Sequence, residues 1–197
     1  MERAAEQGAE GRQPSGDVLT GLHLRPATPA DAPGLAAMHV AGWAETYRGL
    51  MPTTFLAQMT SPAMHERRAA HWERTLAERL ETVTVAEQGG RVVAFTGAGA
   101  TRPHTVIPGD YDAELYTLYA LKRVHGLGLG RALLRASAAA LHAQGYAGLA
   151  LWVLDVNPSR AFYTHLGGAE LGRKTEEVPG GVLTEVALGW RDLRVLL

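Results

Sequence analysis

The sequence predicts an α/β fold built on one mixed β-sheet with helices on its faces. Segments with helical hydrophobic spacing alternate with short β-prone runs, and residues 149–154 are almost wholly apolar, as in a strand covered on both sides. With 197 residues, 46% hydrophobic and 20% charged, the chain is long enough for one well-buried core and short for two. We therefore expect a single domain over residues 22–197.

The order of the elements follows from changes of period and from turn residues. The predicted elements are, in chain order, a strand at 22–25, helices at 29–47, 53–59 and 62–80, strands at 82–87, 91–100 and 113–121, a helix at 131–144, a strand at 149–154, a helix at 158–165, and a closing hairpin of strands at 170–177 and 182–190. Residues 1–21 are rich in Glu, Gln, Gly and Ala and contain no apolar run, so we expect a disordered tail there.

Capping residues mark the ends of the predicted helices. Thr28 before Pro29 and Ser61 before Pro62 each place a capping side chain ahead of a proline, which suits the first position of a helix. Gly145 is placed to end the helix that precedes it, because glycine readily adopts the left-handed conformation found there.

Glycine-containing turns separate the predicted strands. Residues 88–90 and 179–181 each join two β-prone runs in an expected hairpin. Alternation along the strand at 113–121 predicts two opposed sets of side chains, which are Glu114, Tyr116 and Leu118 on one face and Leu115, Thr117 and Tyr119 on the other.

Composition excludes several classes of protein. A formal net charge of -1 gives no excess of Lys and Arg to neutralise phosphates, so we expect no nucleic-acid partner. The absence of cysteine excludes disulfides, thiolate metal sites and a cysteine nucleophile. The histidines lack metal-ligand spacing, so we expect no metal site. No run of about 18 apolar residues occurs, so we expect no membrane partner and a cytoplasmic location.

Three alternating glycines, at 126, 128 and 130, lie where a predicted strand meets a predicted helix. Glycines let backbone N–H groups approach an anion, and the helix start adds partial positive charge, so a pyrophosphate would fit. A plain tight turn is the alternative. A dinucleotide fingerprint would need a further glycine where Arg131 stands, and no Gly-Lys-Ser or Gly-Lys-Thr of a phosphate-binding loop occurs.

This loop resembles the pyrophosphate loop of the GNAT superfamily of acyl-CoA-dependent N-acyltransferases. The family loop reads Gln or Arg, two residues, Gly, one residue, and Gly or Ala, and residues 125–130 are similar with His125 in the first place. Residues 151–168 resemble the family segment of strand, Asn, helix, Phe-Tyr and Leu-Gly, although the Asn-to-Tyr spacing is six here and commonly seven in the family. A weaker similarity at residues 24–47 extends the resemblance over essentially residues 22–190.

The resemblance implies a mostly antiparallel sheet that is splayed between two parallel middle strands, at 113–121 and 149–154. The pantetheine arm of the co-substrate acetyl-CoA would lie in that gap, where unpaired N–H groups near Leu118, Ala120 and Lys122 would bond it and polarise the thioester carbonyl. The implied cofactor-binding residues are Leu118, Tyr119, Ala120, His125, Gly126, Leu127, Gly128, Leu129, Gly130, Arg131 and Asn157.

Acetyl transfer to an amine needs a group that accepts a proton from the amine and a group that donates one to the leaving thiolate. Tyr163 is the expected acid because it matches the family tyrosine near the CoA sulfur; packing in the core is its alternative role. Glu114 is the hypothesised base because its strand borders the expected cleft, against a solvated role at the strand end. Asp155 and Glu45 are the other carboxylates considered.

The side of the cleft away from the glycine loop is expected to receive the acceptor. Trp43, Tyr47 and Tyr116 are the hypothesised substrate-binding residues, although Trp at helical spacing also suits a core position. The expected acceptor is a primary amine on a small molecule or a peptide, and its identity stays open. The terminal hairpin offers edges through which relatives often pair, so a homodimer is one expected state.

The expected function is therefore transfer of the acetyl group of acetyl-CoA to a primary amine, by direct attack in a ternary complex. The alternative is an acyl-CoA-binding sensor or scaffold of the same fold with little catalytic activity. A third reading is an interaction protein unrelated to CoA, which ligand-induced stabilisation would distinguish from the other two.

Overall fold

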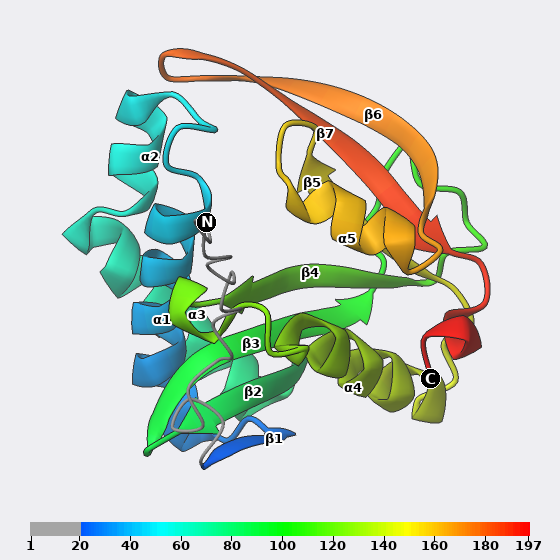
Figure 1. Ribbon diagram of the computed structural model, residues 1–197, viewed down its shortest axis with the longest axis horizontal. Coiled ribbons are helices and arrows are strands. Elements are labelled where there is room, and N and C mark those ends of the chain that lie inside the picture. Colours follow the sequence, from blue (N-terminus) through cyan, green and yellow to red (C-terminus); the bar gives the residue numbers. More distant parts are fainter. Residues whose placement is uncertain (1–20) are drawn as a thin grey trace, which may run out of the picture.

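The computed structural model describes residues 21–197, so the tail predicted over residues 1–21 lies, except for Gly21, outside the described residues. The elements follow in the order β1 (Leu22–Pro26), α1 (Ala32–Thr46), α2 (Thr53–Met59), α3 (Pro62–Glu78), β2 (Thr82–Gln88), β3 (Arg91–Ala100), β4 (Ala113–Ala120), α4 (Leu129–Ala143), β5 (Leu149–Leu154), α5 (Ser159–His165), β6 (Ala169–Val178) and β7 (Gly181–Trp190) (Figure 1). Short 3₁₀ turns lie at Pro29–Asp31, Lys122–Val124 and Leu193–Leu196. Every predicted helix and strand is confirmed, with ends that differ by a few residues.

The strands form one sheet in the order β1-β2-β3-β4-β5-β7-β6. The neighbours β4 and β5 are parallel, and every other neighbouring pair is antiparallel. This confirms the predicted mixed and mostly antiparallel sheet. The last strand, β7, inserts between β5 and β6, so β5 has neighbours on both sides, as its apolar sequence predicts.

Helices cover both faces of the sheet (Figure 1). On one face, Leu134 and Leu141 of α4 pack with Leu151 of β5, and Tyr163 of α5 belongs to the same cluster. On the other face, the core consists of side chains from α1, α3, β2 and β3, which are Ala32, Leu35, Ala36, Met38, Trp72, Leu76, Val83, Val85 and Phe95. None of the helices within residues 21–197 combines the length and apolar character needed to cross a bilayer.

Strand β4 contains a β-bulge at Tyr116. Leu115 and Thr117 pair with consecutive residues of β3, so Tyr116 has no residue opposite it. Because the bulge inserts one residue, Leu115 and Leu118 pack against the same cluster beneath α4. The alternation predicted for this strand is therefore wrong beyond the bulge. Thr117 and Tyr119 lie on the face of the sheet that α1 and α3 cover, which is also the face of Glu114.

The two middle strands separate soon after they begin to pair. Strands β4 and β5 are in register over Ala113–Leu115 and Leu149–Leu151, and the ladder ends there. Beyond these three pairs, β4 continues beside β3 while β5 continues beside β7. The predicted splay between two parallel strands is thus confirmed, and it opens a gap in the middle of the sheet.

Candidate active site

A cavity of about 410 Å³ occupies the gap between β4 and β5. It extends from the start of α4 to the end of α1, so it passes through the sheet from one covered face to the other. The lining residues are Thr46, Tyr47, Leu115, Tyr116, Thr117, Leu118, Tyr119, Ala120, Val124, His125, Gly126, Gly128, Leu129, Gly130, Arg131, Leu151, Trp152, Val153, Asn157, Ser159, Phe162 and Tyr163. Of the predicted site residues, three do not line it, namely Trp43, Glu114 and Leu127.

The glycine loop forms one end of the cavity. Gly126 and Gly128 have φ angles of 76° and 75°, a left-handed conformation that strains residues with a side chain. This backbone directs the chain into α4, whose first N–H groups have no partner within the helix and therefore suit an anion. Gly130 has ordinary helical geometry, and a methyl group there would only touch Phe162 at 3.5 Å. Two of the three glycines are thus required by conformation.

His125 supports the loop from its first position. Its ring Nε2 lies 2.8 Å from the carbonyl oxygen of Ala120, so this nitrogen donates a hydrogen bond to the end of β4. The side chain therefore holds the end of β4 against the loop, and the loop's backbone N–H groups stay free for an anion.

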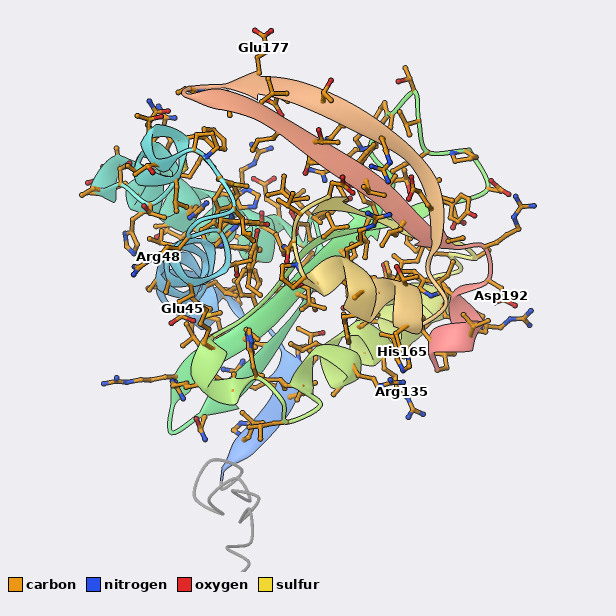
Figure 2. All side chains as sticks on the ribbon, turned by 45° about the horizontal axis from the view of Figure 1, so that its top comes forward. Glu45, Arg48, Arg135, His165, Glu177 and Asp192 are labelled. Atoms are coloured by element: carbon orange, nitrogen blue, oxygen red, sulfur yellow. The ribbon has the colours of Figure 1, made fainter. Side chains whose placement is uncertain are left out.

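The edge of β4 that faces the gap carries hydrogen-bond donors. The N–H of Leu121 bonds to β3, and alternation along an antiparallel ladder then turns the N–H groups of Leu118 and Ala120 toward the gap. The prediction that the N–H of Lys122 is unpaired is wrong, because this N–H donates a hydrogen bond to Glu45 Oε2 at 2.7 Å. Glu45 lies at the end of α1 (Figure 2), and this bond commits its carboxylate to the end of β4.

Asn157 and Tyr163 approach the cavity from the β5 side. Asn157 is buried, and its Oδ1 accepts a hydrogen bond from the N–H of Ser159 at 2.9 Å, which fixes the side chain at the start of α5. The amide NH₂ group is then the part of Asn157 that can donate to a ligand. Tyr163 follows on α5, and its ring packs against Phe162 and Trp190.

The Tyr163 hydroxyl lies in the cavity wall without a side-chain partner among the described residues. Tyr163 is 7% exposed and lines the cavity, and no side chain in the described part of the protein hydrogen-bonds its hydroxyl. Burial, with a smaller contribution from Tyr47, raises the pKa of Tyr163 well above its ordinary value. The phenol is therefore protonated at neutral pH.

Glu114 lies beside the cavity, with its carboxylate turned toward the loop that joins β3 to β4. The side chain is 1% exposed, and it accepts hydrogen bonds from the Arg102 guanidinium and approaches His104 Nε2 at 3.3 Å. Burial alone would raise the pKa of Glu114, but the bonds and charge of Arg102 outweigh burial and lower it. A carboxylate held in its charged form in this way is a weak proton acceptor. Asp155 is similarly committed to Arg160 and Arg173.

Aromatic side chains form the other end of the cavity. The hydroxyl of Tyr47 lies 3.2 Å from that of Tyr119, and both residues line the cavity. Trp43 stands behind them, with its ring 4.8 Å from the ring of Tyr47. Tyr116 lines the cavity, and its hydroxyl donates to the carbonyl of Ala100 at 2.5 Å.

Two charged residues near this end were missed in the sequence. Glu81 immediately precedes β2, with a side chain that is 14% exposed, and Arg68 on α3 is 6% exposed. Both have a periodicity signal: Glu81 stands two residues before buried Val83, and Arg68 four residues before buried Trp72. These spacings place the charged side chains on the inward faces of their elements.

Glu81 lies behind Thr117, with room made by a glycine. A methyl group on Gly97 would come within 2.5 Å of Glu81 Oε2 and within 2.9 Å of Thr117 Oγ1. Both oxygens therefore border the same point beside Gly97. Thr117 lines the cavity, and its Oγ1 is buried without a partner. Burial raises the pKa of Glu81 to about 7, although the charge of Arg102 opposes this.

Comparisons with known proteins agree with this geometry. The model of the Acetyltransferase (GNAT) family matches residues 43–168. The chain is 32% identical over 174 residues to the uncharacterized N-acetyltransferase YuaI of Bacillus subtilis (strain 168), covering 88% of this chain and 95% of that protein.

Two solved structures share the fold. An N-acetyltransferase from Staphylococcus aureus Mu50 is similar with a TM-score of 0.67 and 20% identity, covering 88% of this chain and 99% of that one. The PaiA N-acetyltransferase from Thermoplasma acidophilum, solved in complex with coenzyme A, has a TM-score of 0.57 and 18% identity, covering 84% of this chain and 97% of that one.

Proposed function

The chain belongs to the GNAT family of acetyltransferases, and we propose that it transfers the acetyl group of acetyl-CoA to a primary amine by direct attack while both substrates are bound. Residues 22–197 act as one catalytic domain in this proposal. The observation that supports this proposal most strongly is the separation of β4 and β5 next to the glycine loop. This separation creates one cavity with an end suited to an anion and an aromatic end.

The residues around the cavity fit a CoA thioester. The N–H groups at the start of α4 suit a diphosphate, and Gly126 and Gly128 allow the close approach that a bulky anion needs. The free N–H groups of Leu118 and Ala120 and the amide of Asn157 suit the amide groups of an extended arm. The remaining predicted contacts, with Tyr119, His125, Leu127, Leu129, Gly130 and Arg131, are part of this proposal.

Acetyl-CoA supplies an activated acyl group, and the protein supplies proton transfers and orientation. As the amine nitrogen bonds to the acyl carbon, the bond from that carbon to sulfur breaks, one proton leaves the nitrogen and one proton is needed at the sulfur. Tyr163 is the group proposed to donate a proton to the sulfur. The N–H groups of β4 that face the gap would stabilise negative charge on the acyl oxygen.

Glu81 is our proposed acceptor of the amine proton, in preference to Glu114. A group whose pKa lies near the working pH accepts a proton efficiently and releases it again, and the pKa of Glu81 is about 7. The Thr117 hydroxyl would connect Glu81 to the cavity, and His71 Nε2, 3.7 Å from Glu81 on the solvent side, would carry the proton away. Glu114 would then hold Arg102 in place.

The aromatic end is the proposed binding site for the acceptor. Tyr47 and Tyr116 line it, and Trp43 supports the ring of Tyr47 from behind. The proposed acceptor is a primary amine on a small molecule or on a peptide. A homodimer and a cytoplasmic location stay predictions.

The function is tested by measuring CoA release from acetyl-CoA with a panel of primary amines, together with the unfolding temperature with and without acetyl-CoA. We expect amine-dependent release, and stabilisation of about 4 kcal/mol at a thousandfold excess over the dissociation constant. Stabilisation without release by any amine would favour the binding-module alternative. If acetyl-CoA neither stabilised the protein nor released CoA with any amine, the proposal as a whole would be contradicted.

A further inference from the structure

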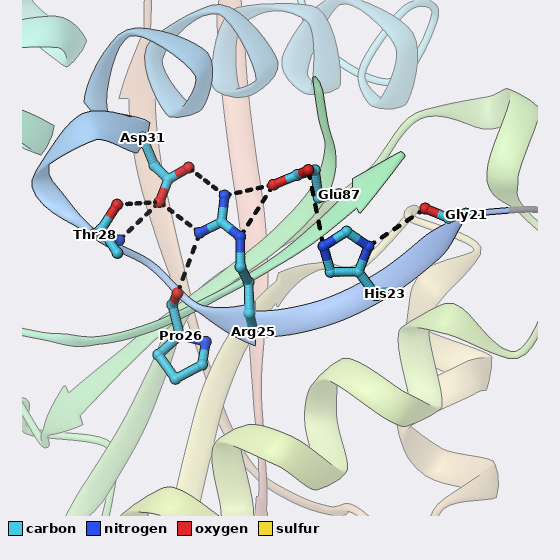
Figure 3. A network of polar contacts seen from close by, with 7 residues as sticks. All are labelled: Gly21, His23, Arg25, Pro26, Thr28, Asp31 and Glu87. Carbon is cyan, nitrogen blue, oxygen red and sulfur yellow. Dashed lines mark hydrogen bonds and ion pairs between the residues drawn. The ribbon is translucent and has the colours of Figure 1, made fainter. Parts of the chain in front are cut away.

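Buried charges in this protein are generally neutralised by an ion partner. Three charged residues within residues 21–197 are classed as buried, namely Asp31, Glu114 and Arg68. Asp31 receives two hydrogen bonds of 2.7 Å from Arg25, which also bonds Glu87 (Figure 3). Glu114 is bonded by Arg102. Such pairing is expected, because an isolated charge loses its hydration when it is buried.

Arg68 departs from this rule. Its side chain is 6% exposed, no carboxylate of the described residues lies within ion-pair distance of it, and its Nη1 is buried without a hydrogen-bond partner. The guanidinium lies over the ring of Trp43, with its carbon 5.1 Å from the ring centre, which offsets part of the lost hydration. Burial lowers the pKa of Arg68, as expected of a cation that lacks a counter-charge.

The neighbours of Arg68 supply further hydrogen-bond donors and no anion. The described side chains contain five buried polar atoms without a partner, and all belong to α1, α3 or the face of β4 below them: His39 Nδ1, Trp43 Nε1, Arg68 Nη1, Trp72 Nε1 and Thr117 Oγ1. Burial and the charge of Arg68 lower the pKa of His39 to about 3, so this ring is neutral. Glu185, whose charge acts on Tyr47, is already paired with Lys174 at 3.0 Å.

Arg68 is next to the aromatic end of the cavity. Arg68 does not itself line the cavity, but its guanidinium lies over the ring of Trp43, and the centre of that ring is 4.8 Å from the centre of the Tyr47 ring, which does line it. Trp43 and Tyr47 therefore connect the guanidinium to the cavity that Tyr163 also lines.

We propose that Arg68 binds a carboxylate of the acceptor, so that the preferred substrates are amines that carry a carboxylate, such as amino acids. This inference rests on the proposed function, because it names the class of acceptor for the same site. A carboxylate would supply the missing counter-charge and accept hydrogen bonds from the guanidinium. The planar fork of N–H donors on the guanidinium matches a carboxylate in shape. The amine of the same molecule would then extend past Tyr47 toward Tyr163.

A binding test addresses Arg68 without requiring turnover. The probe is sodium propionate, compared with sodium chloride at equal ionic strength, and the measurement is the unfolding temperature of the parent, Arg68→Met and Arg67→Met. Arg67 is the matched control because it precedes Arg68 on α3 and is exposed. We expect propionate to raise the unfolding temperature of the parent and of Arg67→Met by about 2 °C or more. Arg68→Met should show no such rise.

A kinetic test then measures the choice of acceptor. Glycine, β-alanine and γ-aminobutyrate are each compared with the matching carboxamide, and the ratio of kcat/KM for acid over amide is determined. We expect Arg68→Met to lower this ratio at least 10-fold, Arg68→Lys to lower it less, and Arg67→Met to leave it unchanged.

The outcomes separate this inference from the proposed function. Equal propionate responses in the parent and Arg68→Met, including no response in either, would overturn the assignment of Arg68 whatever the activity. An unchanged acid-to-amide ratio in Arg68→Met would overturn it as well. Failure of acetyl-CoA to stabilise the parent, with the propionate response intact, would contradict the proposed function alone.

Discussion

The two ends of the cavity are built from different parts of the chain. At the start of α4, the site consists of backbone N–H groups and two left-handed glycines from one continuous segment, residues 125–131. At the end of α1, the lining consists of mainly aromatic side chains from α1 and β4, and the charged side chains of Arg68 on α3 and Glu81 before β2 lie behind it. A backbone site depends on local conformation and tolerates many side chains, whereas a side-chain site changes with each residue. We therefore expect the first end to fix the cofactor and the second to fix the acceptor.

Removing the Tyr163 hydroxyl should have the largest effect. We expect Tyr163→Phe to lower kcat about 10³-fold, because general acid catalysis contributes 10²–10⁴-fold, while the affinity for CoA stays within about twofold. Steady-state kinetics and calorimetric titration with CoA measure the two quantities. An unchanged kcat in the variant would show that Tyr163 has a packing role in the cavity wall and no role as an acid.

Glu81→Gln should have the next largest effect, and it should depend on pH. Because the pKa of Glu81 is about 7, the parent's kcat/KM should rise through that pH as the carboxylate forms. The variant should lose this rise and about 10²-fold of the rate at pH 8. Glu78→Gln, at the exposed end of α3, is the control. A variant profile that overlays the parent's would remove Glu81 from the mechanism.

The same residue predicts a change of stability with pH. The pKa of Glu81 is raised from an ordinary 4.5 to about 7, so its folded state binds the proton more tightly than the unfolded state does. This contribution to stability is fully present below pH 4.5 and is lost as pH rises through 7. We expect Glu81→Gln to gain free energy of unfolding relative to the parent between pH 5 and pH 8. Chemical denaturation at both pH values measures the gain. The same difference in free energy of unfolding between variant and parent at pH 5 and pH 8 would contradict the prediction.

Substitutions in the glycine loop should have smaller effects, confined to the cofactor end. Gly128→Ala forces a left-handed conformation on a residue with a side chain, at a cost of about 1–2 kcal/mol. We expect a roughly 10-fold rise in the KM for acetyl-CoA and no change in acceptor preference. Gly130→Ala is the matched control, since its added methyl meets Phe162 at ordinary contact distance. Equal effects at both positions would show that space, and not conformation, limits the loop.

The sequence was sufficient to predict the elements and the glycine loop at one end of the cavity, because the features that specify them are local. Capping residues, hairpin turns and the glycine loop are local features, and their effect on the backbone is largely independent of the rest of the fold. The bulge at Tyr116 was missed because it depends on pairing with β3 and leaves no mark in the alternation of β4.

The acceptor end could not be assembled from the sequence. Arg68 and Glu81 have inward-facing spacings, but spacing does not reveal whether a buried charge finds a partner. Arg25 and Arg68 are the same residue type, and only the fold brings Asp31 and Glu87 to Arg25 and leaves Arg68 without a carboxylate partner among residues 21–197. Glu114 illustrates the same limit, because its pairing with Arg102 depends on the loop between β3 and β4.

Because the ladder between β4 and β5 is short, we expect a ligand bound between these strands to stiffen the middle of the sheet. Three residue pairs join the halves of the sheet, and α4 packs against strands on both sides of the gap. The facing edges of β4 and β5 beyond Leu115 have no strand to protect their amide hydrogens from exchange with solvent. A bound pantetheine arm would act as the missing strand, slowing that exchange and coupling the two halves mechanically.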